Sequence, residues 1–207
     1  MTGELKRSLL AFVVGAVAVS LLIIPCLAQD VQQYYQQGLA AYQDGKWELA
    51  TEHWKAAASL DPKSAKIHKA LGLAYYQWGA GNKNKQREAE NCQLAIEEFK
   101  KAVSLDPQYA KAYSNMGGAY ACLGDNDKAI QSYEKAISLN PNLTYTYYSL
   151  ALLYKQRNEI AKARQLVKQG DAVSGEEPKE DTDEGWYIVF LEYLKWKSLG
   201  PALEELR

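Results

Sequence analysis

The sequence predicts an all-α protein, built as a solenoid of paired helices. One pattern of small and aromatic residues recurs through the middle of the chain, and each of its first three copies closes on a proline. Its period is 34 residues where it is most regular, a length that fits two short helices and the turns between them. Small, aromatic and small residues at i, i+4 and i+7 share one face of a helix, which predicts close packing against a neighbouring helix.

Residues 1–28 have the three-part layout of a secretory signal peptide. Lys6 and Arg7 precede a charge-free apolar run, and small residues follow it. Residues 9–28 would reach about 30 Å as a helix, so the segment could also remain in the bilayer as a transmembrane anchor. Lipid attachment at Cys26 is a third alternative, although the residues before it fit poorly. In each case the two cations predict that the rest of the chain lies on the trans side of the membrane, in a periplasm, lumen or extracellular space.

The repeated pattern aligns on three prolines. An alanine lies five residues before each proline, an aromatic residue three before that alanine, and a second alanine four before the aromatic residue. An upstream half recurs too, in which Gly or Ala is followed three residues later by Ala or Tyr. Since proline has a fixed φ and no N–H, each copy is expected to end there and the next pair to begin. The aligned residues are Ala50, Trp54, Ala57 and Pro62; Ala95, Phe99, Ala102 and Pro107; Ala129, Tyr133, Ala136 and Pro141; and, upstream, Gly38 with Ala41, Gly72 with Tyr75, Gly117 with Tyr120 and Ala151 with Tyr154.

This register resembles the tetratricopeptide repeat (TPR) family, in which 34-residue helix-turn-helix units stack into an array. The resemblance covers four repeats; the third matches at every signature position, while the fourth has no closing proline. It implies a right-handed α-solenoid with a capping helix at its C-terminal end. Within a repeat domain of residues 29–175, the repeats are expected at residues 31–64, 65–109, 110–143 and 144–175.

The second repeat carries 11 additional residues between Tyr75 and Ala95, because Pro62 and Pro107 lie 45 residues apart instead of 34. Eleven residues make close to three helical turns, so the helix downstream keeps its phase. The inserted stretch begins with Gly and Asn and continues in helix-forming residues, which predicts a second helix lengthened by about two or three turns. The insertion is either a tolerated surface extension or a projection that contacts a partner.

The resemblance also implies a concave groove, lined by the first helix of each repeat. Tyrosine and leucine are frequent at the family's groove positions here, and such a surface suits an extended or helical peptide segment of another protein. Some of these tyrosines could instead pack between helices, and the lysines could favour an acidic partner or simply be solvated. The predicted groove residues are Tyr35, Leu39, Tyr42, Lys66, Lys69, Leu73, Tyr76, Lys111, Tyr145, Tyr148, Leu152 and Lys155. The remaining groove positions hold Gln32, Gln43, Gln77, Ser114, Gly118, Ala121, Cys122 and Gln156.

One branch of the family, the co-chaperones, grips a C-terminal carboxylate with Lys and Asn side chains in the groove. In this sequence the positions that should carry Asn hold Leu39 and Leu73. A carboxylate-clamp function is therefore not expected.

After the repeats the composition changes twice. Residues 176–185 hold six acids and one lysine, which is typical of a solvated linker. Residues 186–207 begin with an aromatic stretch that includes Trp186 and Trp196; as a helix it would carry rings on nearly all sides, so it is expected to be buried. It could cap the last repeat, fill the array's own groove, join a second copy through residues 186–199, or lie at a membrane interface.

The sequence contains no cluster of titratable residues with the spacing of a catalytic, metal or cofactor site, so neither enzymatic activity nor a cofactor is expected. The two histidines, His53 and His68, flank the first turn between repeats and are interpreted as ordinary helix residues. Cys92 and Cys122 are interpreted as small buried or half-buried residues, with a disulfide between them left open. A net charge of -1 argues against nucleic acid as a partner.

These predictions favour a non-catalytic scaffold or assembly factor that binds a peptide segment of another protein in the groove. The alternative is a stable structural subunit of a membrane-associated complex, docked through the C-terminal aromatic helix. A scaffold is expected to be substoichiometric and to exchange, whereas a subunit is expected to be equimolar with its complex.

Overall fold

The computed structural model of the protein describes residues 29–80 and 84–174. The predicted signal peptide or anchor (residues 1–28), the acidic linker (residues 176–185) and the aromatic segment (residues 186–207) with its capping role lie outside the described residues. These three therefore stay predictions. Within the described residues, no helix is both long and apolar enough to cross a membrane.

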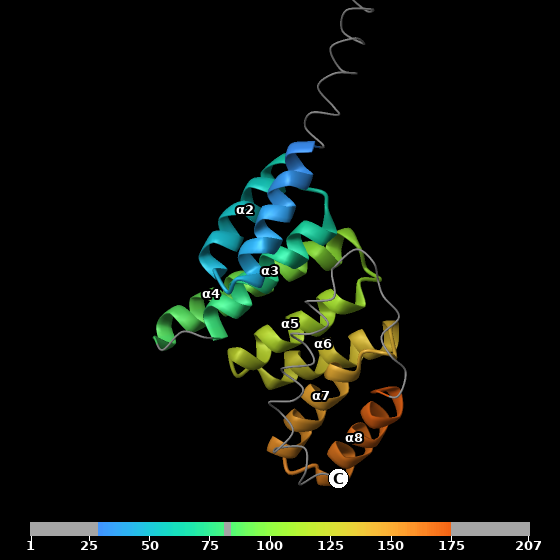
Figure 1. Ribbon diagram of the computed structural model, residues 1–207. Coiled ribbons are helices and arrows are strands. Elements are labelled where there is room, and N and C mark those ends of the chain that lie inside the picture. Colours follow the sequence, from blue (N-terminus) through green and yellow to red (C-terminus); the bar gives the residue numbers. More distant parts are fainter. Residues whose placement is uncertain (1–28, 81–83, 175–207) are drawn as a thin grey trace, which may run out of the picture.

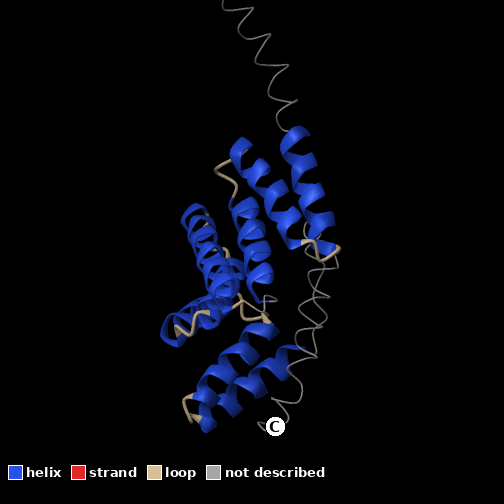
Figure 2. Ribbon diagram, turned by 90° about the vertical axis from the view of Figure 1, so that its left-hand side faces the viewer, coloured by secondary structure: helices blue, strands red, loops and turns tan. Residues whose placement is uncertain are grey.

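The described residues form helices joined by short turns, and each helix packs mainly against its neighbours in sequence. Figure 1 shows these helices stacked in order from the first helix to α8, and in Figure 2 the described elements are helices joined by loops, so the predicted all-α solenoid is confirmed. The four pairs are the first helix (residues 29–43) with α2 (Trp47–Leu60), α3 (Ala65–Ala80) with α4 (Lys85–Leu105), α5 (Ala110–Cys122) with α6 (Asn126–Leu139), and α7 (Thr144–Gln156) with α8 (Ile160–Ser174).

The turns follow from the residues at the helix ends. The prolines that close the first three repeats directly follow the C-capping residues of α2, α4 and α6. Because proline has no N–H to continue the hydrogen-bond ladder, each of these helices ends there. Inside three of the pairs, the turn adopts the left-handed conformation, at Gly45 (φ 73°), Gly124 (φ 75°) and Asn158 (φ 63°). Gly and Asn are the residues that adopt this conformation at least cost.

The recurring glycine of each first helix lies directly against the recurring aromatic ring of the second helix. A Cβ atom added at any of three such glycines would lie only 2.5 to 2.7 Å from the nearest ring atom. Real Cβ atoms do not approach ring carbons so closely, so the sequence spacing is a packing requirement between the two helices of a pair. The contacts are Gly38 with Trp54, Gly72 with Phe99, and Gly117 with Tyr133.

Replacing Gly117 with alanine is expected to destabilise the protein relative to the same change at the adjacent Gly118. A Cβ at Gly117 would lie 2.7 Å from the buried Tyr133 ring, whereas one at Gly118 would lie 3.4 Å from the end of the half-buried Tyr76 side chain. Both changes gain the same helix propensity, so the difference isolates the overpacking, about 1–3 kcal/mol. Chemical denaturation of the two variants measures it, and equal midpoints would contradict the packing role of Gly117.

The 11 additional residues of the second repeat lengthen both of its helices. α3 has 16 residues against 13 in α5, and α4 has 21 against 14 in α6. The gain of about two turns in α4 is the lengthening that the sequence predicts, and the shorter gain in α3 is an addition to it. Figure 1 shows the far end of this pair projecting beyond the neighbouring pairs.

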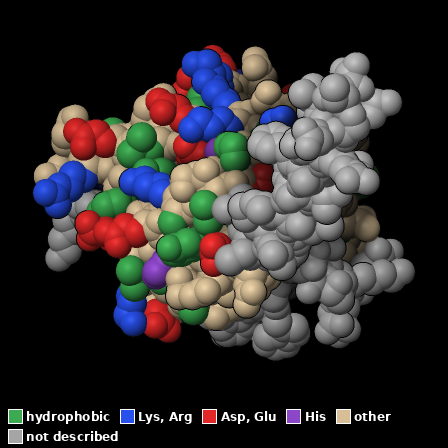
Figure 3. Space-filling model, turned by 90° about the horizontal axis from the view of Figure 1, so that it is seen from above, with side chains coloured by type: hydrophobic (Ala, Val, Ile, Leu, Met, Phe, Trp, Pro, Cys, Tyr) green, Lys and Arg blue, Asp and Glu red, His purple; other side chains and the backbone are tan. Residues whose placement is uncertain are grey.

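The outer surface mixes both signs of charge. In Figure 3 the Lys and Arg side chains of the described part lie interspersed with Asp and Glu, and small hydrophobic groups lie between them. This distribution matches the near-neutral net charge of the chain. On this face the described part therefore presents no broad basic surface of the kind that nucleic acid requires.

Candidate functional site

The predicted groove residues fall into two groups by burial. Tyr35, Tyr42, Leu73 and Tyr148 are exposed by 5% or less and belong to the two hydrophobic clusters of the array. For these residues the alternative role, packing between helices, is the main one. Leu39, Lys66, Tyr76, Lys111, Tyr145, Leu152 and Lys155 are half-buried, and Lys69 is almost fully buried.

A group of tyrosines from all four repeats meets in the groove. Burial raises the pKa of the Tyr76 hydroxyl, and the nearby hydroxyls of Tyr145 and Tyr42 raise it further. Burial also raises the pKa of Tyr133 well above its ordinary value, with Tyr145 and Tyr76 again as neighbours. The hydroxyls of Tyr76 and Tyr133 therefore keep their protons near neutral pH and remain hydrogen-bond donors.

Tyr133 is a member of this group that the family register does not predict, because it comes from a second helix, α6. Its hydroxyl lies beside Gly118 of α5 and the Tyr76 hydroxyl: a Cβ at Gly118 would lie 3.5 Å from the Tyr133 oxygen and 3.4 Å from the Tyr76 oxygen, which are ordinary contact distances. The sequence holds no signal for this, because the register uses Tyr133 only as the aromatic residue that packs within the repeat.

Three lysines form a row near the beginning of two successive first helices, two of them on α3 and one on α5. The Lys66 ammonium lies 4.9 Å from the centroid of the Tyr35 ring, and the Lys69 ammonium lies 5.9 Å from that of Tyr109. Lys111 follows two residues after Tyr109, in the first turn of α5. We call Lys66, Lys69 and Lys111 the lysine row; it gives one edge of the groove a positive charge and aromatic surfaces that favour cations.

The last repeat is tied to the groove by Tyr148. The Tyr148 hydroxyl donates to Asp171 Oδ1 at 2.8 Å, and a Cβ at Gly170 would lie 2.7 Å from the Tyr148 ring. A buried hydroxyl pair, Ser114 Oγ and Thr146 Oγ1 at 2.8 Å, joins α5 to α7 in the same region. These contacts place the final turn of α8 beside the groove residues of α7.

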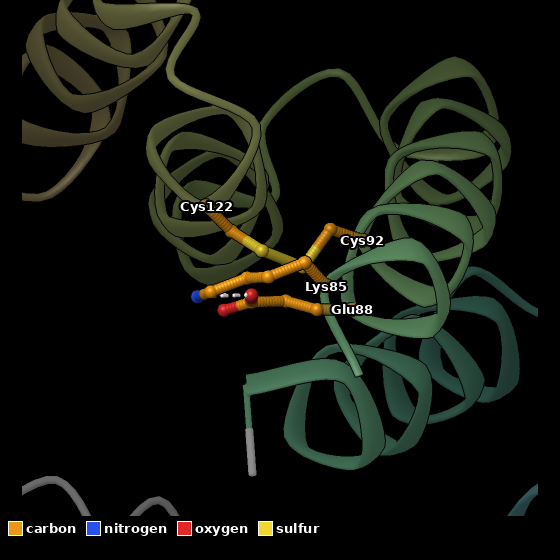
Figure 4. Close-up of a disulfide and its surroundings, with 4 residues drawn as sticks. All are labelled: Lys85, Glu88, Cys92 and Cys122. Atoms are coloured by element: carbon orange, nitrogen blue, oxygen red, sulfur yellow. Dashed lines mark hydrogen bonds and ion pairs between the residues drawn. A yellow bond between two sulfur atoms is a disulfide. The ribbon is translucent and has the colours of Figure 1, made fainter. Parts of the chain in front are cut away.

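Cys92 and Cys122 form a disulfide (Figure 4), which answers the pairing question that the sequence left open. Their Cα atoms lie 6.4 Å apart, and the bond joins α4 to the last residue of α5. Cys122 stands at a groove position by the family register, but its sulfur is directed to α4 instead. The bond therefore fastens the lengthened second repeat to the third, next to the ion pair of Lys85 and Glu88 at 2.6 Å.

His68 has a structural role that its sequence context does not reveal. Its Nδ1 lies 2.6 Å from Glu98 Oε2 and its Nε2 lies 3.0 Å from the carbonyl oxygen of Pro62. Because that carbonyl can only accept, the Nε2 atom is the donor. Lys101 also pairs with Glu98, at 2.7 Å. This group ties the turn after α2 to α4, so His68 is a buried linking residue rather than an ordinary helix residue.

Between residues 29 and 174, apart from residues 81–83, the chain holds no group of three or more His, Cys, Asp or Glu side chains that could bind a metal ion. His53 is half-buried, with its ring centroid 6.4 Å from that of Tyr34. Two open hollows on the surface, one beside Trp47 and Trp78 and one beside Leu94 and Leu123, include no predicted groove residue.

Comparison with protein families agrees with this geometry. Residues 38–79 and 87–124 match the TPR repeat, and residues 110–143 and 132–165 match two further models of the tetratricopeptide repeat. Together these matches cover more than half of the chain. The chain belongs to the tetratricopeptide repeat family. Tetratricopeptide repeats are in general protein-interaction modules without catalytic activity, so the family supports protein partners.

Solved structures of other TPR proteins have the same fold. The crystal structure of MamA is 26% identical with a TM-score of 0.61, and the match covers 84% of this chain and 96% of that one. A thermophilic TPR protein of Thermus thermophilus is 22% identical with a TM-score of 0.65, covering 84% and 90%. The first TPR of Spaghetti (RPAP3), bound to the HSP90 peptide SRMEEVD, is 22% identical with a TM-score of 0.56, covering 63% and 94%. No curated protein matches this TPR protein in sequence.

Proposed function

We propose that this TPR protein is a non-catalytic scaffold or assembly factor, which holds an acidic peptide segment of another protein in its concave groove on the trans side of a membrane. The observation that carries the proposal is the position of the lysine row beside a group of tyrosines from all four repeats. The lysines attract carboxylates, and the tyrosines supply contact area and hydrogen bonds for the peptide backbone.

The mode of recognition we propose differs from a carboxylate clamp. The HSP90 peptide bound to the RPAP3 repeat ends in acidic residues, which supports an acidic partner for a groove of this fold. In this chain, however, Leu39 and Leu73 occupy the positions where a clamp would carry Asn. We therefore assign recognition to acidic side chains along the peptide, paired with the lysine row, rather than to a terminal carboxylate.

The trans-side part of the proposal has two supports. The first is the signal or anchor pattern of residues 1–28. The second is the disulfide between Cys92 and Cys122, since disulfides persist in oxidising compartments and are rare in the cytosol.

A charge-reversal variant tests the groove. The tagged chain, purified from gently solubilised membranes, is expected to lose its co-purifying proteins by at least about tenfold when Lys66 and Lys111 are both changed to Glu, because each reversal turns an attraction into a repulsion. Both lysines are half-buried, so their removal disturbs the core less than a change at the buried Tyr148 would.

The matched control is the double variant Lys100→Glu and Lys135→Glu, which makes the same charge change at exposed positions of α4 and α6. It is expected to keep the partners. If both variants retain the same proteins, the groove is not the binding surface, and docking through residues 186–207 as a structural subunit becomes the better explanation.

A further inference from the structure

We propose that the acidic segment of residues 176–184 binds within its own chain along the lysine row, and that a partner must displace it. The regulatory part of this inference rests on the proposed function of the groove. The contact itself does not, because it involves only residues of this chain and can be detected without any partner.

The C-terminal end of the array, at α8, lies next to a helix that lines the groove. Asp171 accepts a hydrogen bond from the groove residue Tyr148 at 2.8 Å, and α8 ends three residues later, at Ser174. The acidic segment begins two residues after that. The chain therefore leaves the last helix from a turn that is hydrogen-bonded to α7, one of the helices that line the groove.

The segment is also long enough. Extended chain spans about 3.3–3.6 Å per residue, so the ten residues 175–184 reach about 35 Å. Packed helices lie about 8–10 Å apart, so α3 lies roughly 20 Å from α7 across α5. α5 contacts both of these helices, to α7 through Ser114 and Thr146 and to α3 directly. Residues 176–184 can thus pass α5 and reach α3.

The charges of the segment and of the lysine row are complementary. Residues 176–184 hold six carboxylates and one lysine, while Lys66, Lys69 and Lys111 lie on successive first helices. Tethering adds to this, because a short linker holds the segment at an effective concentration on the order of millimolar.

Zero-length cross-linking of the full chain in mild detergent tests the contact. A carbodiimide joins carboxylates to amines that lie in direct contact, and an equal mixture of ¹⁴N- and ¹⁵N-labelled protein separates links within a chain from links between copies. We expect links from residues 176–184 to Lys66, Lys69 and Lys111, within a single isotope, that fade in about 1 M salt because surface charges are then screened. Links only between copies would assign the groove to a second copy, and links spread over lysines of the second helices would leave the segment without a site; either result overturns the proposal.

Lysine reactivity supplies the second measurement, with matched variants. Changing the six acids of residues 176–184 to their amides is expected to raise the acetylation rate of Lys66 and Lys111 at least about threefold, with Lys100 and Lys135 unchanged. The control changes Glu204 and Glu205 to Gln and should alter none of these rates. Equal rates in wild type and the amide variant would contradict the contact. If the segment contacts the lysine row but partner binding does not depend on Lys66 and Lys111, the proposed function is wrong and the intramolecular contact is supported. If partner binding depends on these lysines but the segment does not contact them, the contact is wrong and the proposed function is supported.

Discussion

Replacing Trp54 with alanine is expected to lower the free energy of unfolding by about 3–5 kcal/mol. Trp54 is 1% exposed and packs against Gly38 and the rings of Tyr35 and Tyr42. Its indole N–H donates to the carbonyl oxygen of Tyr35 at 3.1 Å, joining α2 to the first helix. Alanine would leave a cavity in the first repeat and remove the donor from that carbonyl.

We expect the Trp54→Ala variant to lose structure first in the first repeat and only later along the whole array. In a solenoid each repeat contacts only its neighbours, so amide hydrogen exchange is expected to rise first in the first helix and α2, while α7 and α8 keep their protection. The control is Trp54→Phe, which retains a ring against Gly38 and should lose only part of the stability. Uniform deprotection along the whole array would contradict this picture of nearest-neighbour packing.

Removing the disulfide between Cys92 and Cys122 is expected to lower stability by about 3–4 kcal/mol. The bond closes a loop of 30 residues in sequence separation, and in the unfolded chain the loss of that closure restores conformational freedom. The Cys92→Ser, Cys122→Ser double variant should therefore unfold at a markedly lower denaturant concentration than the oxidised wild type.

Reduction offers a matched comparison for this effect. A reducing agent should shift the wild-type midpoint towards that of the double variant and leave the variant itself unchanged. If the reductant shifts both proteins equally, or neither, the bond does not contribute the expected stability. The same experiment on protein taken directly from cells reports whether the chain meets an oxidising compartment.

Much of the fold was predictable because the size of the side chains in the repeat determines how the helices pack. A glycine that lies opposite an aromatic residue determines which two helices pack closely. The proline that follows determines where each pair of helices ends. The contacts of Gly117 with Tyr133 and of Gly72 with Phe99 follow directly from that register. The 11-residue insertion kept its helical phase, so its effect on α4 could also be anticipated.

The groove was harder to predict, because a family register assigns a position to a residue but not its burial. Tyr35 and Tyr148 hold groove positions, yet both are buried within the hydrophobic clusters of the array. Tyr133 belongs to the second helix α6, to which the register assigns no groove position, yet its hydroxyl lies near those of Tyr76 and Tyr145. The disulfide and the pairing of His68 with Glu98 link residues 30 positions apart, and no local pattern records such pairs.

The disulfide also gives the array a mechanical property. If this protein holds a partner near a membrane, a force applied between the two ends of the repeat array extends the stack of helices. Without a disulfide, the 30-residue segment could unfold and extend to about 100 Å. The bond between Cys92 and Cys122 prevents this extension as long as it stays oxidised. Tension is then carried from α4 to α5 through a covalent link, so the chain between Cys92 and Cys122 does not bear it.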